Sequence, residues 1–332
     1  MRNLLSQETK SIISRIIKVS LKPLILLKWR RDMKYGLPLT ASHFEIYYNI
    51  HHRYWVKFFK FPNLTECEDF NDKINWLKLF DQDKIAINCC DKVGVRDFVK
   101  ERIGSGYLPE LYQVADNFDG LDLDSLPCSM VIKTNHDSGT VFLVNNKEDF
   151  DKGLVGTKIS NALSAKFGMQ DGEWPYALVS PKVFAEEMLE SKDGLPPADY
   201  KFHCVNGHVK WLQYIYDRGV STKEVIIDAN GCIENIHFDR GMHQGSDFVI
   251  PECWPEMISV VEKLSNNFKY LRVDLYLINN SRILVGELTF FPLAGLYSGS
   301  GQIELGRRLD FDRQTYKKCI VNELLDNKGI SK

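Results

Sequence analysis

The stretch that most constrains the fold is 270–292, in which two runs of β-branched and aromatic residues flank an Asn-Asn-Ser sequence. This pattern predicts a β-hairpin, because apolar strand formers on both sides of turn residues signal paired strands. Side chains two residues apart in a strand share a face, as Arg272 and Asp274 do on the first strand. Glu287 and Thr289 share a face of the second strand in the same way. If the strands pair in register, a guanidinium, two carboxylates and a hydroxyl converge on one patch.

Such a patch suits a magnesium ion that bridges phosphate oxygens. Carboxylate oxygens are hard ligands for Mg²⁺, and an adjacent arginine stabilises developing negative charge. An amphipathic hairpin with a solvated, salt-bridged face explains the same charges, since surface ion pairs are common. Apolar residues that alternate with the charged ones favour burial of the opposite face; they are Leu271, Val273, Leu275, Ile283, Val285 and Leu288.

The length and composition are those of a soluble globular protein. A chain of 332 residues, 44% hydrophobic and 26% charged, is long enough for two or three packed lobes. Its net charge of −2 provides no general attraction to nucleic acid, so we expect no nucleic-acid partner. The charge is uneven, because residues 1–60 carry twelve Lys or Arg against three Asp or Glu.

The cysteines and the apolar runs indicate the compartment. The eight cysteines form no C-x-x-C pair and no metal-ligand spacing, so we expect reduced, partly buried thiols. Arg15, Lys18 and Lys22 interrupt the apolar residues near Met1, which argues against a signal peptide. No run of eighteen apolar residues indicates a membrane span. The expected location is the cytoplasm.

Residues 1–34 alternate apolar and basic side chains, partly at helical spacing. We expect a basic amphipathic helix that Pro23 kinks or divides, because proline lacks the amide that continues helical hydrogen bonding. Such a helix suits peripheral contact with the anionic inner face of the cytoplasmic membrane. Packing on the protein body or on a partner explains the same pattern, and the sequence leaves these alternatives open.

The segment CCDKVGVRDFVKERIG predicts a helix with Asp91 as its N-cap and Gly104 as its C-cap. Lys92 and Arg96 are four residues apart and so share the face opposite the apolar one. These two basic residues either reach a ligand or remain solvated. The helix pattern alone does not decide between the two.

Three later strands carry polar residues. The first ends at Lys133 and leads into a turn formed by His136, Asp137, Ser138 and Gly139. This turn is not a Walker loop, because no helix follows it directly; a plain β-turn beside a surface lysine is the alternative. The next strand ends in Glu186, Glu187, Met188 and Leu189, and adjacent acids on a strand point to opposite faces. The third strand begins a hairpin with an Asn-Gly turn and places Asp199 and Lys201 on one face.

Arg-x-Asp, a short turn and Glu-x-Thr, followed by proline and glycine, resemble the metal-binding end of ATP-grasp enzymes. More closely, the chain resembles the TupA-like ATP-grasp family, which is associated with bacterial surface-polysaccharide biosynthesis. The resemblance covers roughly residues 62–311 and rests on five separated elements in the expected order. Thr289 stands where many ATP-grasp proteins have asparagine, so the metal geometry is expected to differ.

The resemblance implies an α+β ATP-grasp fold, in which two α+β lobes grip Mg·ATP and a basic helical N-terminal extension precedes them. The implied division is an extension at 1–60, an N-terminal α/β part at 61–130, a small lobe at 131–190 and a large C-terminal lobe at 191–332. The small lobe would hold the phosphate hairpin and the adenine hinge, and the large lobe the metal site.

The resemblance also implies roles for the motif residues. The expected catalytic residues are Arg272 and Lys201, and the expected metal ligands are Asp274, Glu287 and Thr289. The expected nucleotide-binding residues are Lys92, Lys133, His136, Ser138, Gly139, Glu186, Glu187, Leu189, Asp199 and Lys201. In this interpretation Lys133 contacts phosphate, turn amides cap the terminal phosphate, and the backbone near Leu189 pairs with adenine.

The expected cofactors are ATP and Mg²⁺, and the expected reaction is carboxylate–amine ligation. A substrate carboxylate attacks the γ-phosphate, and an amine then captures the acyl phosphate to form an amide. The family association implies a uronic acid of a capsular or related surface polysaccharide, or its precursor, as the carboxylate. It implies an amino acid or amino-sugar derivative as the amine.

Three alternatives stay open at this point. The same fold serves a kinase that phosphorylates a sugar hydroxyl. A glycosyltransferase requires nucleotide-sugar contacts, for which the acidic linker at Asp122 and Asp124 is a poor candidate. A catalytically silent scaffold would keep the fold without the reaction.

Overall fold

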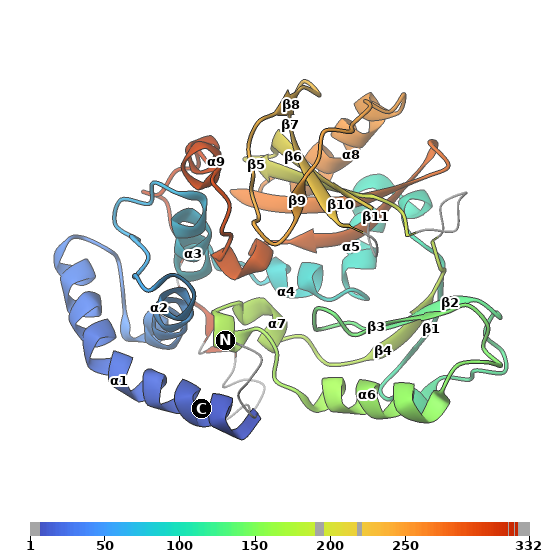
Figure 1. Ribbon diagram of the computed structural model, residues 1–332, viewed down its shortest axis with the longest axis horizontal. Coiled ribbons are helices and arrows are strands. Elements are labelled where there is room, and N and C mark those ends of the chain that lie inside the picture. Colours follow the sequence, from blue (N-terminus) through green and yellow to red (C-terminus); the bar gives the residue numbers. More distant parts are fainter. Residues whose placement is uncertain (1–6, 190–195, 218–220, 318, 322, 325–332) are drawn as a thin grey trace.

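The computed structural model describes residues 7–189, 196–217, 221–317, 319–321 and 323–324. A seven-stranded sheet and a four-stranded sheet form two bodies, which we call the large lobe and the small lobe, and helices α1 to α3 lie to one side of both (Figure 1). This combination of helices with two largely antiparallel sheets is the predicted α+β class.

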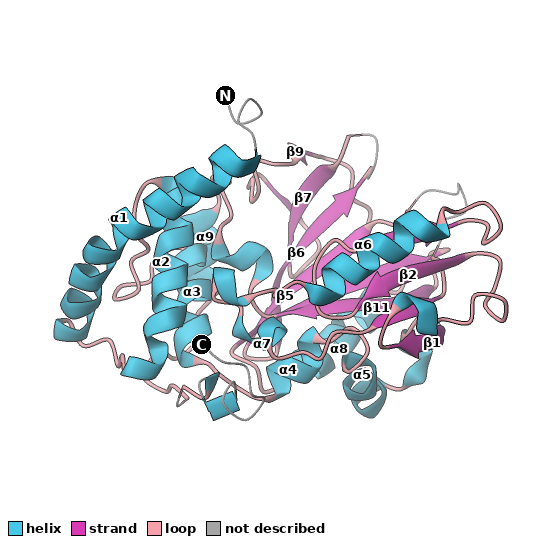
Figure 2. Cartoon of the chain, turned by 90° about the horizontal axis from the view of Figure 1, so that it is seen from below, coloured by secondary structure: helices cyan, strands magenta, loops and turns pink. Residues whose placement is uncertain are grey.

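The small lobe consists of helix α6 and a sheet in the order β1-β4-β2-β3. Its elements are β1 (Leu111–Ala115), β2 (Met130–Thr134), β3 (Val141–Val144), α6 (Lys152–Ser164) and β4 (Val183–Glu186). Asp151 caps α6 by accepting a hydrogen bond from the amide of Leu154 at 2.8 Å. Figure 2 shows α6 lying along this sheet, where it buries Val155 and Ile159 in a core of their own. Because β1 pairs with β4, the expected boundary at residue 130 runs through this sheet.

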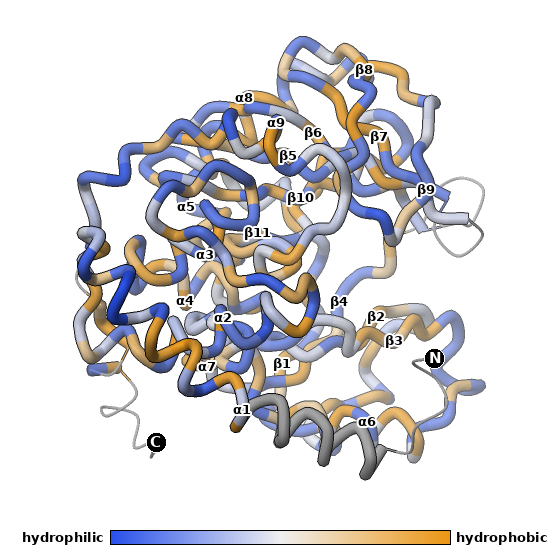
Figure 3. The backbone as a smooth tube through the Cα atoms, turned by 60° about the vertical axis from the view of Figure 1, so that its left-hand side comes forward, coloured by the Kyte–Doolittle hydropathy of each residue, from blue (hydrophilic) through white to orange (hydrophobic). Residues whose placement is uncertain are grey.

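The large lobe has the strand order β11-β10-β5-β6-β7-β8, and β9 pairs in parallel with β7. Its elements are β5 (Asp199–Val205), β6 (His208–Tyr216), β7 (Lys223–Asp228), β8 (Ile233–Glu234), β9 (His243–Gln244), α8 (Trp254–Ser265), β10 (Tyr270–Ile278) and β11 (Arg282–Thr289). Helix α8 packs against β5, β6 and β10 and buries the face that carries Met257, Val260, Val261 and Leu264. Hydrophobic residues (orange in Figure 3) recur along the central strands, whose apolar side chains fill the main core.

The predicted hairpin turns lie where the sequence placed them. Asn206 and Gly207 adopt φ of 51° and 82° between β5 and β6, a conformation that asparagine and glycine tolerate best. Asn279 and Asn280 likewise have positive φ between β10 and β11. The turn residues therefore set where each hairpin reverses.

The N-terminal part forms α1 (Gln7–Lys34), α2 (Phe44–Phe58) and α3 (Phe70–Phe80). The expected division at Pro23 does not occur, because α1 continues through this residue. Leu21 and Ile25, on either side of the proline, are both buried, and this packing holds the helix together across the missing hydrogen bond. Within the described residues, no helix has the length and apolar character needed to cross a membrane.

Several short helices lie outside the two sheets: α4 (Ile85–Cys90), α5 (Val95–Ile103), η4 (Met169–Asp171), α7 (Trp174–Ala177), η5 (Pro292–Gly295) and α9 (Gln302–Arg308). Gly104 is the C-cap of α5, as predicted, but Asp91 is not its N-cap. Asp91 instead follows the end of α4, and its carboxylate accepts from the amide of Val93 at 2.8 Å. The Asp91 side chain, which was expected to cap α5, therefore stabilises the turn between α4 and α5.

A buried ammonium group joins α3, η4 and η5. Lys78 on α3 is 0% exposed, and its Nζ donates to Asn75 Oδ1 at 3.0 Å. The same Nζ donates to the carbonyl oxygens of Asp171 at 2.7 Å and Ala294 at 2.9 Å. A buried charge is tolerable only when its hydrogen-bonding capacity is met, and here all three N–H bonds have acceptors. Lys78 therefore fixes the positions of the three segments.

We expect Lys78→Met to lower the free energy of unfolding by about 3 kcal/mol, because three buried acceptors lose their donor while the side-chain volume is kept. Urea denaturation followed by circular dichroism measures the change. Lys152→Met is the control, since Lys152 is exposed at the start of α6, and it should stay within about 0.5 kcal/mol of the parent. Equal stability of the two variants would contradict the assigned role of Lys78.

Candidate functional site

The register of β10 and β11 decides which side chains face the site. The strands pair without interruption from the turn to Leu275 and Val285, and pairing resumes at Asp274 and Glu287. Gly286 is the extra residue of this β-bulge. Strand residues alternate between faces, so without the bulge Glu287 would point towards the hydrophobic core. The bulge instead places Glu287 on the same face as Asp274.

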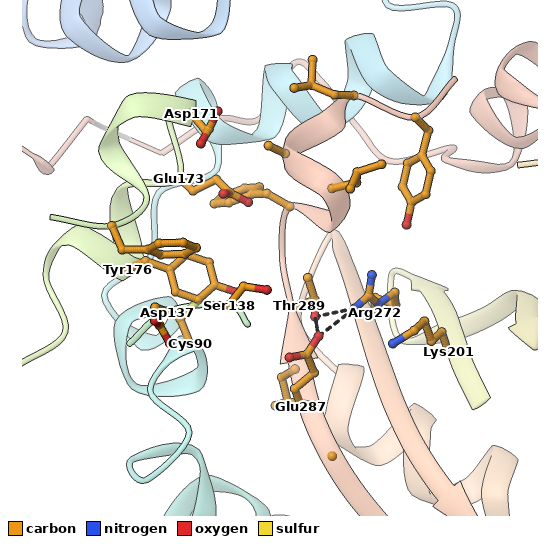
Figure 4. Close-up of a pocket in the computed structure, with 18 of the residues that line it drawn as sticks. Cys90, Asp137, Ser138, Asp171, Glu173, Tyr176, Lys201, Arg272, Glu287 and Thr289 are labelled. Carbon is orange, nitrogen blue, oxygen red and sulfur yellow. Dashed lines mark hydrogen bonds and ion pairs between the residues drawn. The ribbon is translucent and has the colours of Figure 1, made fainter. Parts of the chain in front are cut away.

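Arg272 lies at the centre of the predicted patch, and its guanidinium is buried. Its Nε and Nη2 donate to Asp274 Oδ1 and Oδ2 at 2.6 and 2.7 Å. The same Nη2 donates to Glu287 Oε1 at 2.8 Å and to Thr289 Oγ1 at 3.0 Å (Figure 4). The Thr289 hydroxyl in turn donates to Glu287 Oε1 at 2.9 Å. The structure therefore brings together all four residues on which the prediction depended.

Lys201 supplies a second positive charge on this face. It stands opposite Asp274 in the pairing of β5 with β10, and its Nζ contacts Asp274 Oδ2. The same Nζ lies 3.3 Å from Asp199 Oδ1. Burial alone would raise the pKa of Asp274, but Arg272 and Lys201 outweigh burial and hold this pKa below its ordinary value. Asp274 therefore stays ionised between two cations.

A cavity of about 510 Å³ lies between the two lobes, and we call it the first cavity. The predicted nucleotide-binding residues line it, with the exception of His136; they are Lys92, Lys133, Ser138, Gly139, Glu186, Glu187, Leu189, Asp199 and Lys201. Its apolar lining consists of Val95, Leu108, Val131, Val141, Leu143, Phe184, Met188, Tyr276 and Val285. An apolar cavity with a few convergent polar groups is the usual form of a nucleotide or small-ligand site.

Glu186 contacts two positively charged side chains, Lys133 on β2 and Arg96 on α5. Lys133 Nζ lies 2.6 Å from Glu186 Oε1, and Arg96 Nη1 lies 3.4 Å from Glu186 Oε2. Arg96 also donates to the carbonyl oxygen of Pro109. Both cations line the first cavity, where an anionic ligand group would offer them the same kind of oxygen acceptor.

Four hydrogen bonds stabilise the turn after β2. Lys92 Nζ donates to the carbonyl oxygens of Thr134, at 3.2 Å, and of Asp137. The Asp137 carboxylate accepts from the hydroxyls of Thr134 and Thr140, so its charge stabilises the turn. Gly139 has a φ of 102°, which a glycine adopts without strain. These contacts leave Ser138 and Gly139 at the cavity wall.

His136 and Glu187 differ from what the sequence suggested. His136 is 2% exposed, and its Nε2 lies 3.2 Å from the carbonyl oxygen of Ala162 on α6, so the ring packs into the small lobe. Glu187 lines the first cavity together with Glu186, although strand alternation allowed only one of them to do so. The alternation rule fails because β4 ends at Glu186. The Glu187 carboxylate accepts from Arg282 Nη2 at 2.8 Å.

A second cavity of about 630 Å³ adjoins the first. The two share Lys92, Val95, Ser138, Lys201, Gly286 and Glu287 as lining residues. Figure 4 shows Asp171, Glu173 and Tyr176 on one side of the second cavity and Thr289, Arg272 and Glu287 on the opposite side. The predicted metal-binding face is therefore open to two neighbouring spaces.

Sequence reasoning missed part of both cavities. Arg96 lines the first cavity but was not assigned to the site. Its position four residues after Lys92, on the same face of the predicted helix, was the sequence feature that could have identified it. Arg53, Asp171 and Glu173 line the second cavity from α2 and the η4–α7 segment, which carry no recognisable motif. Only the tertiary packing of these segments shows that they belong to the site.

The donor set fits Mg²⁺. Asp274 and Glu287 each place a carboxylate oxygen on the same Arg272 nitrogen, at 2.7 and 2.8 Å, and Thr289 adds a hydroxyl. The side chain of Glu287 is 43% exposed and lines both cavities. Among the described residues, no three His, Cys, Asp or Glu side chains are grouped to hold a metal by themselves. Mg²⁺ does not need such a group, because it commonly combines one or two carboxylates with phosphate oxygens.

We expect Arg272→Met to lower the free energy of unfolding by about 3 kcal/mol, because it leaves a buried carboxylate network without its central cation. Thermal and urea unfolding measure the loss. Arg240→Met serves as the control, since Arg240 is exposed, and we expect it to change stability by less than about 0.5 kcal/mol. If Arg272→Met unfolds like the control, the network contributes nothing to the fold.

Solved structures with similar folds include several ligases, all of low identity. N5-carboxyaminoimidazole ribonucleotide synthetase from Thermotoga maritima matches with 15% identity and a TM-score of 0.34, over 60% of this chain and 41% of its own. D-alanine–D-alanine ligase from Bacillus anthracis, complexed with ATP, matches with 16% identity and a TM-score of 0.36, over 61% and 55%. L-amino acid ligase from Bacillus licheniformis matches with 14% identity and a TM-score of 0.40, over 68% and 49%. The chain spans about half the length of these structures.

A comparison with curated proteins gave no match. The family model described as TupA-like ATPgrasp matches residues 72–306, which is well over half of the chain. The matched range contains Lys92, Lys133 and Arg272, and it begins after α1 and α2. The match confirms the predicted ATP-grasp fold. The chain belongs to the TupA-like ATP-grasp family.

Proposed function

We propose that the protein is an ATP-dependent carboxylate–amine ligase. The carboxylate of one substrate attacks the γ-phosphate of ATP, ADP leaves, and an amine displaces phosphate from the acyl phosphate to form an amide. Family membership supports this reaction class. This reaction requires that the reactants be aligned and that the negative charge developing on the transferred phosphoryl group be compensated. A rigid site with several cations meets both requirements.

One observation carries the proposal: the Arg272, Asp274, Glu287 and Thr289 patch lies where the two cavities meet. A ligase of this kind needs a nucleotide space and an acceptor space that share the phosphoryl group. The first cavity suits ATP, because its apolar lining is combined with lysines near the patch. The second cavity is the space in which the carboxylate and the amine would meet the γ-phosphate.

Each residue of the patch has a role in this proposal. Asp274 and Glu287, with Thr289, would hold Mg²⁺, which when bound compensates charge on phosphate oxygens. Arg272 orients both carboxylates and places a fixed positive charge beside them. Lys201 lines both cavities and is placed to contact the phosphate chain from the large lobe.

The small lobe would hold the rest of the nucleotide. Lys133 and the turn at Ser138 and Gly139 are proposed to grip the phosphates, since point charges and turn amides both bind phosphate oxygens. The backbone near Met188 and Leu189 is proposed to pair with the adenine edge, and Asp199 or Glu187 with the ribose. His136 is left out, because its ring packs against α6.

We further propose that the carboxylate belongs to a uronic acid of a bacterial surface polysaccharide or its precursor. This part rests on the association of the family with such glycans. Peripheral contact of α1 with an anionic membrane surface would bring the enzyme to membrane-borne intermediates. Leu24 and Leu27 are 50% and 61% exposed on α1, close to the exposed basic residues Lys22 and Arg30, as such a contact requires.

Glu287→Gln should abolish most turnover while preserving the fold. It removes the charge of a proposed Mg²⁺ ligand but keeps the shape, so we expect kcat for ADP release to fall by at least about 100-fold. ADP release with ATP, Mg²⁺, D-glucuronate or D-galacturonate and hydroxylamine is the measurement. Normal turnover by Glu287→Gln and by Asp274→Asn would refute the metal site. ADP release without amine, together with a phosphorylated sugar, would favour a kinase.

Mass spectrometry of surface glycans from cells with and without the gene tests the substrate. We expect the loss of an amide-linked substituent, which lowers the mass of the glycan unit by the mass of the amine minus one water. Complementation with the parent gene should restore the substituent, and complementation with the Glu287→Gln gene should not. An unchanged glycan would count against a uronic acid of that glycan as the substrate.

A further inference from the structure

The wall of the second cavity opposite Arg272 comes from three segments. Helix α2 contributes Arg53, η4 contributes Asp171, and the residue that precedes α7 contributes Glu173. Lys78 on α3 fixes the backbone of this wall by donating a hydrogen bond to the carbonyl oxygen of Asp171 at 2.7 Å. Gly172 has a φ of 72° and lies close to Ile50 of α2, so the turn between the two acids fits tightly against that helix. The wall is therefore a built surface.

The carboxylates that line this cavity differ in what they contact. Asp171 forms an ion pair with Arg53, and Glu287 forms one with Arg272 at 2.8 Å. Asp137 accepts from threonine hydroxyls in its own turn, and Asp239 Oδ1 accepts from the amide of Gly241 at 3.0 Å. Within the described part of the chain, Glu173 has no hydrogen bond to its carboxylate and no cation within ion-pair distance. Glu173 thus presents a carboxylate without a direct hydrogen-bond or ion-pair partner to the cavity, across from the patch that would hold the phosphoryl group (Figure 4).

We infer that Glu173 binds the ammonium group of the amine substrate and takes the proton that this amine must lose before it attacks the acyl phosphate. The inference rests on the proposed ligase function and assigns the amine half of the reaction to one residue. A carboxylate serves the amine in two ways. Its negative charge attracts the ammonium group, and it accepts the proton that the ammonium must lose before the nitrogen has a lone pair with which to attack. A carboxylate substrate would be repelled from the same wall, so it belongs at the Arg272 side.

The proposed step consists of proton transfer, C–N bond formation and loss of phosphate. The ammonium gives one proton to the Glu173 carboxylate, and its freed lone pair forms the C–N bond at the acyl carbon. The C–O bond to phosphate breaks, and its electron pair leaves with the phosphate. The second proton of the nitrogen goes to the departing phosphate, and the third remains on the amide. Glu173 then releases its proton to solvent, so no oxidant, reductant or further reactant is needed.

The electrostatic surroundings agree with this role. Burial raises the pKa of Glu173 above its ordinary value, and Lys78 on α3 opposes the shift without cancelling it. Asp171 and Glu287 raise this pKa further, and Arg53 lowers it. A carboxyl whose pKa is moved towards neutrality is a better proton acceptor for an amine than an ordinary one.

The test separates two nucleophiles. Hydroxylamine is already neutral near pH 7 and needs no base, so it traps the acyl phosphate as a hydroxamate. The twenty common amino acids and glucosamine are ammonium ions at that pH and need to lose a proton. Each reaction contains ATP, Mg²⁺ and one of two uronate probes, D-glucuronate or D-galacturonate. Hydroxamate is measured by its colour with ferric ion, and amides are measured by mass spectrometry.

We expect Glu173→Gln to reduce amide formation about 100-fold near neutral pH, the usual size of a lost general base, while hydroxamate formation falls by less than about 3-fold. Raising the pH to about 9.5 should restore part of the amide formation, because more of the amine is then neutral. A residue that only supports the wall would not give this pH-dependent recovery. Glu45→Gln, an exposed carboxylate of α2, is the control and should match the parent in both assays.

Four outcomes overturn the inference. One is a Glu173→Gln variant that forms amides as well as the parent. A second is equal loss of hydroxamate and amide, which would mark Glu173 as structural. A third is a selective loss of amide formation in Asp239→Asn and not in Glu173→Gln, since Asp239 is the rival carboxylate of this cavity. The fourth is a parent protein that forms hydroxamate but joins none of the amines. A parent that forms no hydroxamate refutes the ligase proposal itself, and this inference with it.

Discussion

The one-residue bulge at Gly286 is the constraint on which the rest of the site depends. It shifts the pairing of β10 with β11, so that Glu287 stands opposite Asp274 and Thr289 opposite Arg272. A continuous ladder would have turned Glu287 and Thr289 towards the core, where a carboxylate without a partner is costly. The bulge joins the Arg272–Asp274 ion pair of β10 to the hydrogen-bonded Glu287 and Thr289 of β11 in one network. Arg272 can then be buried, because each of its neighbours accepts a hydrogen bond from it.

The same arrangement explains why the site lies between the lobes. Strand β5 pairs with β10 and places Lys201 opposite Asp274. Strands β5, β10 and β11 therefore present two cations and three carboxylates on one face, the carboxylates being those of Asp199, Asp274 and Glu287. The small lobe meets this face with Lys133 and the turn at Ser138. Its own acid, Glu186, holds Lys133 and Arg96 at the cavity wall. The cations are thus positioned by carboxylates of the two sheets and still face a space in which phosphate oxygens fit.

Local sequence signals identified the elements of this site but not how they meet. Turn residues such as Asn206 and Gly207 fixed the hairpins, and strand periodicity placed Arg272 with Asp274 correctly. Nothing in the sequence marked Gly286 as a bulge, because an isolated strand glycine is also compatible with a regular strand. The orientation of His136 depends on α6, which packs against it from 26 residues away, and no local pattern reports that contact. Strand alternation also failed at Glu187, since the strand ends one residue earlier.

The second cavity shows how a segment outside the family match contributes to the site. Helix α2 precedes residue 72, where the match begins, and yet Arg53 pairs with Asp171 on the cavity wall. Lys78 holds the same wall to α3, and its third acceptor is Ala294 in η5, directly after the strand that carries Thr289. One buried ammonium group therefore sets the separation between the wall with Glu173 and the patch with Arg272. In the proposed ligase the acyl and amine groups would meet across this gap, so these hydrogen bonds would set the distance between the reactants as well as stabilise the fold.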